Sequence, residues 1–157
     1  MNLTLCCSDR TRWLAEARLA SCVRDEILHL HEGQDRVFAY CLMPDHLHLV
    51  LATGGQPLGQ IVQRFKGRSS RALRKLRGGL TPWQHGYHDR VVRRSDGLLA
   101  SVEYVLLNPV RAGLVSSWWE YPWLGAPALG TVGPDLFSSA PAEDILWAEL
   151  LGDQSGV

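Results

Sequence analysis

The chain has 157 residues, which suffices for one domain with a proper hydrophobic core and is too short to expect two. Hydrophobic residues make up 46% and charged residues 20%, as in an ordinary soluble globular protein, and no apolar run approaches the roughly 18 residues of a membrane helix. The net charge of zero hides an asymmetry, because residues 60–94 carry ten Lys or Arg and one acid, whereas no Lys or Arg follows Arg111. We therefore expect a basic surface for a polyanion and an acidic C-terminal segment.

The start of the chain has no basic region followed by an apolar core, so no signal peptide is expected. The four cysteines show no Cys-x-x-Cys spacing, which disfavours a zinc knuckle. Reduced and mostly buried thiols in a cytoplasmic protein are the expectation.

The first third of the chain predicts a strand, a helix and a hairpin. The strand covers residues 3–7, and the helix covers about 11–30, where apolar residues recur at helical spacing. Two strands rich in Val, Leu, Phe and Tyr follow at 37–42 and 47–52. Pro44 marks the tight turn between them, because proline cannot donate a hydrogen bond to a central strand.

The clearest helix is predicted over residues 58–76, where apolar residues form one face and Gly78-Gly79 ends the pattern. Basic residues spaced i, i+4, i+7 and i+11 form a stripe beside that face: Arg64, Arg68, Arg71 and Lys75. A solvated helix face is the plain alternative, but such faces usually mix signs and this one has no acid. The stripe therefore favours contact with the phosphates of a nucleic acid. We expect it to be exposed and to border the face of the sheet that carries His46 and His48.

Two short elements follow, a strand at about 88–93 and a helix at about 98–107 that Pro109 ends. The order strand, helix, strand, strand, helix, strand, helix predicts an α+β, ferredoxin-like fold, in which helices flank an antiparallel sheet. We assign this fold to a domain at 1–124 and expect a loosely structured segment at 125–157.

That C-terminal segment is rich in Gly, Pro, Ala and Ser up to residue 141, which predicts a loose connector. A short terminal helix is predicted at about 142–151.

Two His-Leu-His sequences occur, and periodicity separates them. Because strand side chains alternate between faces, His46 and His48 point the same way, roughly 7 Å apart at the backbone, and can converge on one metal ion. His29 and His31 end a helix, where residues two apart point to different sides. The plain alternative for the strand pair is that both imidazoles face water on the open side of the sheet.

The helix at 98–107 places two polar residues away from its apolar stripe. Tyr104 and Asn108 lie one turn apart on that side, so Tyr104 is a candidate nucleophile and Asn108 a candidate partner or third metal ligand. The alternative is a surface tyrosine whose ring packs on a neighbouring helix. Three other tyrosines have the same chemistry: Tyr40, Tyr87 and Tyr121.

Four motifs in order, MPDHLHLVL, FKGRSSRALRK, WQHGYHDRVVR and YVLLNPVRAGLV, resemble the REP-associated tyrosine transposases, which belong to the HUH single-strand endonucleases. The likeness runs from about residue 38 to 115, roughly half of the chain, and the first strand and helix fit the family layout. It implies that His46 and His48 hold Mg²⁺ or Mn²⁺, that Tyr104 attacks the scissile phosphate to leave a 5′-phosphotyrosine, and that Asn108 is the third ligand.

The sequence departs from the family at two of these positions. Related insertion-sequence transposases usually have Gln where Asn108 stands. Asp45 stands where many members have Asn, so it adds a charge beside the expected metal ion.

The resemblance implies a metal-dependent endonuclease and strand transferase that acts on single-stranded DNA with hairpins of the repetitive extragenic palindrome type. The residues expected to contact DNA are Arg64, Lys66, Arg68, Arg71, Lys75, Arg90, Arg93 and Arg111.

The rival interpretation is a protein of the same descent that binds DNA hairpins or repeats without cutting, which the presence of both histidines and the tyrosine disfavours. An RNA-binding ferredoxin-like module is disfavoured too, because RNA-recognition sheets place aromatic residues where this chain has histidines. The choice between monomer and homodimer stays open.

Overall fold

Five antiparallel strands form one sheet in the order β4-β1-β3-β2-β5. The computed structural model describes residues 1–79, 81–130 and 132–139. The strands are β1 (Asn2–Cys6), β2 (Arg36–Met43), β3 (His46–Ala52), β4 (His88–Arg90) and β5 (Leu124–Gly125). The α-helices are α1 (Ala17–Glu32), α2 (Leu58–Leu76), α3 (Leu98–Leu106), α4 (Asn108–Arg111) and α5 (Leu136–Ser139).

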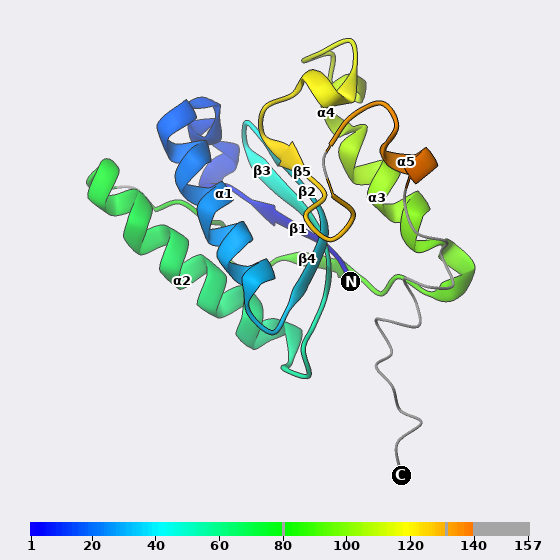
Figure 1. Ribbon diagram of the computed structural model, residues 1–157. Coiled ribbons are helices and arrows are strands. Elements are labelled where there is room, and N and C mark those ends of the chain that lie inside the picture. The colour runs from blue at the N-terminus through cyan, green and yellow to red at the C-terminus, as the bar shows by residue number, and fades with distance from the viewer. Residues whose placement is uncertain (80, 131, 140–157) are drawn as a thin grey trace.

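The chain order β1-α1-β2-β3-α2-β4, with β3 between β1 and β2 in the sheet, is the ferredoxin-like arrangement, so the predicted fold class is confirmed. Figure 1 shows α1 and α2 on one side of the sheet and α3 on the other. The sheet is therefore the middle layer of three.

The alternation of side chains along the strands builds a separate core on each side of the sheet. On β3, Leu47, Leu49 and Leu51 are buried with apolar residues of α1 and α2. Val50 points the other way and is buried with apolar residues of α3, whose inner positions include Val102 and Val105. The two histidines of β3 share the side of Val50, so they lie in the layer between the sheet and α3.

The β2–β3 hairpin closes through a two-residue turn at Pro44 and Asp45, as predicted, with Met43 and His46 as its last paired residues. Two neighbouring segments bind this turn through backbone hydrogen bonds. Cys7 N–H donates to the Asp45 carbonyl at 2.9 Å, and Leu14 N–H donates to the Pro44 carbonyl at 3.1 Å. The turn is thus fixed from both sides, and the register of β3 with it.

The predicted start of the first helix near residue 11 is wrong by six residues. Residues Ser8–Arg10 and Trp13–Ala15 form 3₁₀ turns, and the α-helix begins at Ala17. The reason is tertiary, because the Leu14 amide is bound to Pro44 and the Trp13 indole N–H donates to the Pro82 carbonyl at 3.0 Å. These contacts hold the segment in turns in spite of its helical pattern of apolar residues.

Pro109 ends α3 as predicted but also begins a second short helix. The Leu107 backbone stays in the helical region, and Pro109 occupies the first turn of α4, where its missing N–H costs no internal hydrogen bond.

The predicted strand at 88–93 is shorter than expected, because β4 pairs with β1 only from His88 to Arg90.

The predicted boundary after residue 124 falls inside β5, which pairs with Tyr40 and Cys41 of β2. Beyond β5, the predicted loose connector adds Ala126 and Leu136 to the core under α3. The predicted terminal helix at 142–151 lies outside the described residues. In the described part of the chain, no helix is long and apolar enough to cross a membrane, and all four cysteines are free thiols.

Gly54 tests how tightly the end of β3 packs against the start of β2. A Cβ at position 54 would lie 2.2 Å from the Gln34 carbonyl oxygen, which is a backbone atom. The Gly54 amide also donates a hydrogen bond to Asp35 Oδ1 at 3.0 Å, so the Gly54 backbone cannot move away without breaking that bond. We expect Gly54→Ala to lower the free energy of unfolding by about 2 kcal/mol or more, measured by urea denaturation. Gly67→Ala is the control, because this α2 position is open and alanine should stabilise it by up to about 1 kcal/mol. Equal effects of the two changes would contradict the packing argument.

Candidate metal and nucleophile site

His46 and His48 converge on the α3 side of the sheet. Their Nε2 atoms lie 3.0 Å apart, and the rings meet edge to face, with centroids 4.7 Å apart and planes at 88°. The geometric prediction for this pair is therefore confirmed. In the described part of the chain His29 and His31 make no such contact, and His31 Nδ1 accepts a hydrogen bond from the Val37 amide.

Each imidazole is held from behind by a polar side chain. Asp45 Oδ1 accepts from His46 Nδ1 at 2.6 Å, and Thr4 Oγ1 lies 3.0 Å from His48 Nδ1. Because a carboxylate only accepts, the hydrogen bond places a proton on Nδ1 of His46 and directs its Nε2 atom toward His48. A hydrogen bond at the remote nitrogen is the usual way in which proteins orient a histidine ligand.

His48 is held in its neutral form. Burial, together with the positive charges of His46, Arg10 and Arg111, lowers the pKa of His48 to about 4. Burial opposes ionisation of Asp45, but the hydrogen bond to His46 and the nearby charges of His46 and Arg10 still lower the pKa of that carboxyl. The neutral form of an imidazole is the one that binds a metal ion.

The spacing of the two imidazoles fits an octahedral divalent ion. Adjacent ligands of such an ion, each about 2.1 Å from it, lie about 3.0 Å from one another, and the Nε2 atoms are 3.0 Å apart. Among the residues that the structure describes, no third His, Cys, Asp or Glu completes a metal cluster. Two nitrogen ligands would leave most coordination positions to water or to phosphate oxygens, which suits a labile ion more than a structural one.

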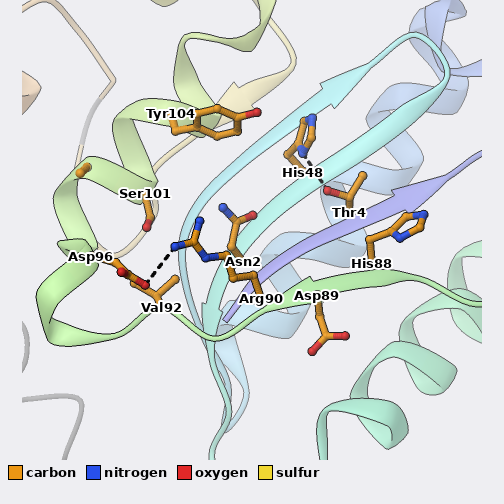
Figure 2. Close-up of a pocket in the computed structure, with 11 residues that line it drawn as sticks. Asn2, Thr4, His48, His88, Asp89, Arg90, Val92, Asp96, Ser101 and Tyr104 are labelled. Carbon is orange, nitrogen blue, oxygen red and sulfur yellow. Dashed lines mark hydrogen bonds and ion pairs between the residues drawn. The ribbon is translucent and has the colours of Figure 1, made fainter.

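Tyr104 lies across a pocket from His48. The pocket, of about 480 Å³, is lined by both residues, and Figure 2 shows the phenol oxygen pointing from α3 toward the side where His48 lies. The Tyr104 side chain is exposed to solvent. The Arg111 guanidinium lies over its ring, 4.3 Å from the centroid, and donates to the Tyr104 carbonyl at 3.1 Å. Arg111 thus connects α4 to the ring of Tyr104.

Asn108 does not contact the histidines through any hydrogen bond in the described part of the chain. Its Nδ2 atom donates to the carbonyls of Tyr104 at 3.0 Å and Val105 at 3.1 Å. The amide group therefore turns back onto α3, and its role as third ligand stays a prediction.

Arg10 is a site residue that the sequence analysis missed. It belongs to a turn in which Asp9 and Arg10 have φ of 53° and 54°, a region that residues other than glycine seldom adopt. Its guanidinium lies 3.5 Å from Asp45 Oδ2 and 3.4 Å from Cys6 Sγ. Only the register that sets Cys6 opposite His46 brings Arg10 here, and no sequence motif signals that pairing.

The basic stripe of α2 lies in the layer opposite the histidines, so the prediction that it borders their face is wrong. Arg64 pairs with the buried Asp35 at 3.2 Å, and Arg68 pairs with Glu26 at 2.8 Å. The apolar residues of α2 pack in the core that holds the leucines of β3, which carries the stripe to that side. Arg71 and Lys75 are exposed and make no ion pair in the described part of the chain.

The other residues predicted to contact DNA do not all lie on the same side of the sheet. The Lys66 ammonium donates to the carbonyls of Gln84, at 2.8 Å, and Gly86, so it fixes the loop before β4. Arg90 lines the Tyr104 pocket and pairs with Asp96 at 3.5 Å. The Arg93 amide donates to the same carboxylate at 3.2 Å. Arg90 and Arg111 are therefore the predicted cations that border the histidine side.

The shifted pKa of His48 predicts a pH-dependent stability. The unfolded chain takes up this proton near pH 6.5, whereas folded His48 does so only near pH 4. Because the unfolded state binds more protons between these values, stability falls as the pH drops through this window, by at most about 3 kcal/mol. Urea denaturation from pH 4 to 8, with a chelator, should show this decrease, and His48→Gln should remove it. Equal pH slopes for the two proteins would contradict the shift.

The chain matches one protein family and resembles two solved structures. A family model for IS200-like transposases matches residues 1–105. A solved REP-associated tyrosine transposase bound to a REP hairpin is similar with a TM-score of 0.66 and 18% identity over 90% of each chain. A presumed transposase from Deinococcus radiodurans gives a TM-score of 0.51 and 21% identity, over 72% of this chain and 82% of that one. No curated protein sequence matches. Because the family match covers more than half of its length, the chain belongs to the family of IS200-like transposases.

Proposed function

We propose that this chain is a metal-dependent single-strand DNA endonuclease and strand transferase that works through a covalent tyrosine intermediate. The observation that carries the proposal is the 3.0 Å approach of the His46 and His48 Nε2 atoms beside the pocket that Tyr104 lines. Two converging imidazoles, and an exposed phenol that shares a pocket with one of them, could supply a metal site and a nucleophile.

His46 and His48 would hold Mg²⁺ or Mn²⁺, with Asn108 as the predicted third ligand. When bound, the ion supplies positive charge that polarises a phosphate oxygen and favours the ionised phenol. Asp45 orients the ring of His46, and Thr4 orients the ring of His48, each through a hydrogen bond to the Nδ1 atom of that histidine. Arg10 and Arg111 add positive charge on the same side, as their effect on His48 indicates.

In the proposed step, the Tyr104 oxygen attacks the phosphorus of a phosphodiester and loses its proton to solvent. The bond between phosphorus and the 3′ oxygen breaks, and that oxygen takes up a proton and leaves as a 3′-hydroxyl. The 5′ end stays attached to Tyr104 as a phosphotyrosine. Because this ester keeps the energy of the phosphodiester, a second 3′-hydroxyl can reverse the reaction without a nucleotide cofactor.

Hairpin-bearing single-stranded DNA is the proposed substrate. The structural likeness to a transposase that was solved with a REP hairpin supports this choice. Arg90, which is largely exposed at the edge strand beside the pocket, and Arg111 are positioned to meet phosphates near the cleaved bond. Arg71 and Lys75, in the opposite layer, would contact DNA outside the pocket.

Replacing Tyr104 with Phe tests the covalent mechanism. The change removes one exposed oxygen, so the fold and the affinity for DNA should be kept while the adduct and cleavage are abolished. The measurement is incubation with hairpin-bearing single strands and Mg²⁺ or Mn²⁺, followed by denaturing electrophoresis for a protein–DNA adduct.

Two tyrosines that do not line this pocket provide the controls. Tyr87→Phe removes another exposed phenol, and Tyr121→Phe removes a hydroxyl that donates to the Leu42 carbonyl at 2.9 Å. Both variants should still form the adduct. Cleavage by Tyr104→Phe would point instead to attack by water, and binding by the wild type without any adduct would favour the rival, a repeat-binding protein that no longer cuts.

The α2 stripe predicts a separate effect on affinity. Arg71→Gln with Lys75→Gln should weaken single-strand binding and reduce the slope of log affinity against log salt by about one for each phosphate that the variant no longer binds. Stability should not change, because neither side chain has an ion-pair partner in the described residues. Arg18→Gln, at an exposed position of α1, is the control. Unchanged affinity in the double variant would make the stripe an ordinary solvated surface.

A further inference from the structure

We propose that the pocket between α3 and the edge of the sheet binds the nucleobase next to the cleaved phosphate, and that Asn2 reads the edge of that base. This inference rests on the proposed function, because it names what lies beside the reacting phosphate. It concerns residues of β1 and β4 that the proposed reaction does not use.

The strand register gathers the polar side chains of the pocket. Thr4 of β1 is paired with both His48 of β3 and His88 of β4, and Asn2 is paired with Arg90. Since alternate residues share a face, all of these side chains lie on the side of the sheet that faces α3. Figure 2 shows them along the floor of the pocket, with Ser101 and Tyr104 of α3 opposite.

Several polar groups of the pocket are already bonded, whereas the side chains of Asn2, His88 and Asp89 and the Tyr104 hydroxyl make no hydrogen bond in the described part of the chain. Thr4 is occupied by His48, Arg90 is paired with Asp96, and the Ser101 hydroxyl donates to the Gly97 carbonyl at 3.1 Å. The donors and acceptors of Asn2 and His88 are therefore available to a ligand.

The remaining wall is suited to a flat ring. Val92, Ala100 and the Tyr104 side chain supply apolar surface, and the volume of about 480 Å³ lies within the usual range for small-ligand sites. An unpaired base needs an apolar surface for its face and hydrogen-bonding groups for its edge. The pocket offers both.

The position of the pocket indicates which nucleotide of the strand it would hold. His48 and Tyr104 line its rim, so a phosphate between them would deliver its neighbouring nucleotide into the pocket. The Asn2 carboxamide presents one donor next to one acceptor, which matches the adjacent N6 donor and N7 acceptor of adenine. We therefore expect adenine to be the preferred base.

The experiment uses hairpin-bearing oligonucleotides that carry A, G, C, T or an abasic unit at one position of the single strand at a time. Their affinities for the full chain with Tyr104→Phe are measured with and without Asn2→Ala. At one position, adenine should bind about tenfold more tightly than the other bases. Asn2→Ala should reduce this ratio to below about twofold and leave the affinity for the abasic strand unchanged.

A conservative variant separates base reading from folding. Asn2→Asp keeps the shape of the side chain but replaces its donor with a second acceptor, so preference should move from adenine, whose N7 acceptor would face the carboxylate, toward cytosine, whose N4 donor has no acceptor on its C5 side. Gln34→Ala, an exposed amide beyond the C-terminal end of α1, should keep the adenine preference. If the parent protein and the Asn2→Asp protein prefer the same base at every position, the inference is overturned.

The outcomes also separate this inference from the proposed function. An adduct with wild-type protein but no position at which Asn2 alters base preference would refute the base pocket alone. Position-specific adenine preference without any adduct would support the pocket and refute cleavage. The absence of both effects would refute the pocket and the cleavage together.

Discussion

The register of β3 between β1 and β2 is the constraint on which the site depends. A shift by one residue would send both histidines into the apolar core under α1 and α2 and turn three leucines toward α3. The two-residue turn at Pro44 and Asp45 prevents this shift, because Cys7 and Leu14 bind its two carbonyls. The same turn places the Asp45 carboxylate beside His46, so one short segment sets both the register of β3 and the orientation of the His46 ring.

The sequence was sufficient to predict the ferredoxin-like order of elements and the shared face of His46 and His48, because both depend on simple periodicity. It could not predict the start of α1, where contacts of Trp13 and Leu14 with distant prolines override the helical pattern. The sequence also could not show on which side of the sheet the arginines of α2 lie. A helical stripe is defined relative to its own apolar face, and only the tertiary structure shows which face of the sheet that apolar side covers.

Charges around the histidine pair are balanced locally. Asp45 contributes a negative charge beside His46, and the Arg10 guanidinium lies 3.5 Å from it. Because Arg10 comes from the turn directly after β1, its placement depends on an unusual backbone at two non-glycine residues. The Asp45 carboxylate is therefore accompanied by a cation from a different part of the chain.

The second core, between α3 and β2, has a consequence for stoichiometry. Val102 and Val105 hold α3 against Phe38 and Cys41 of the same polypeptide, so Tyr104 faces the histidines of its own chain. The pocket therefore takes both Tyr104 and His48 from a single copy of the protein. Under the proposed function, a mixture of copies lacking the histidines with copies lacking the tyrosine would have no intact site unless α3 left this core, which would cost the burial of its apolar face.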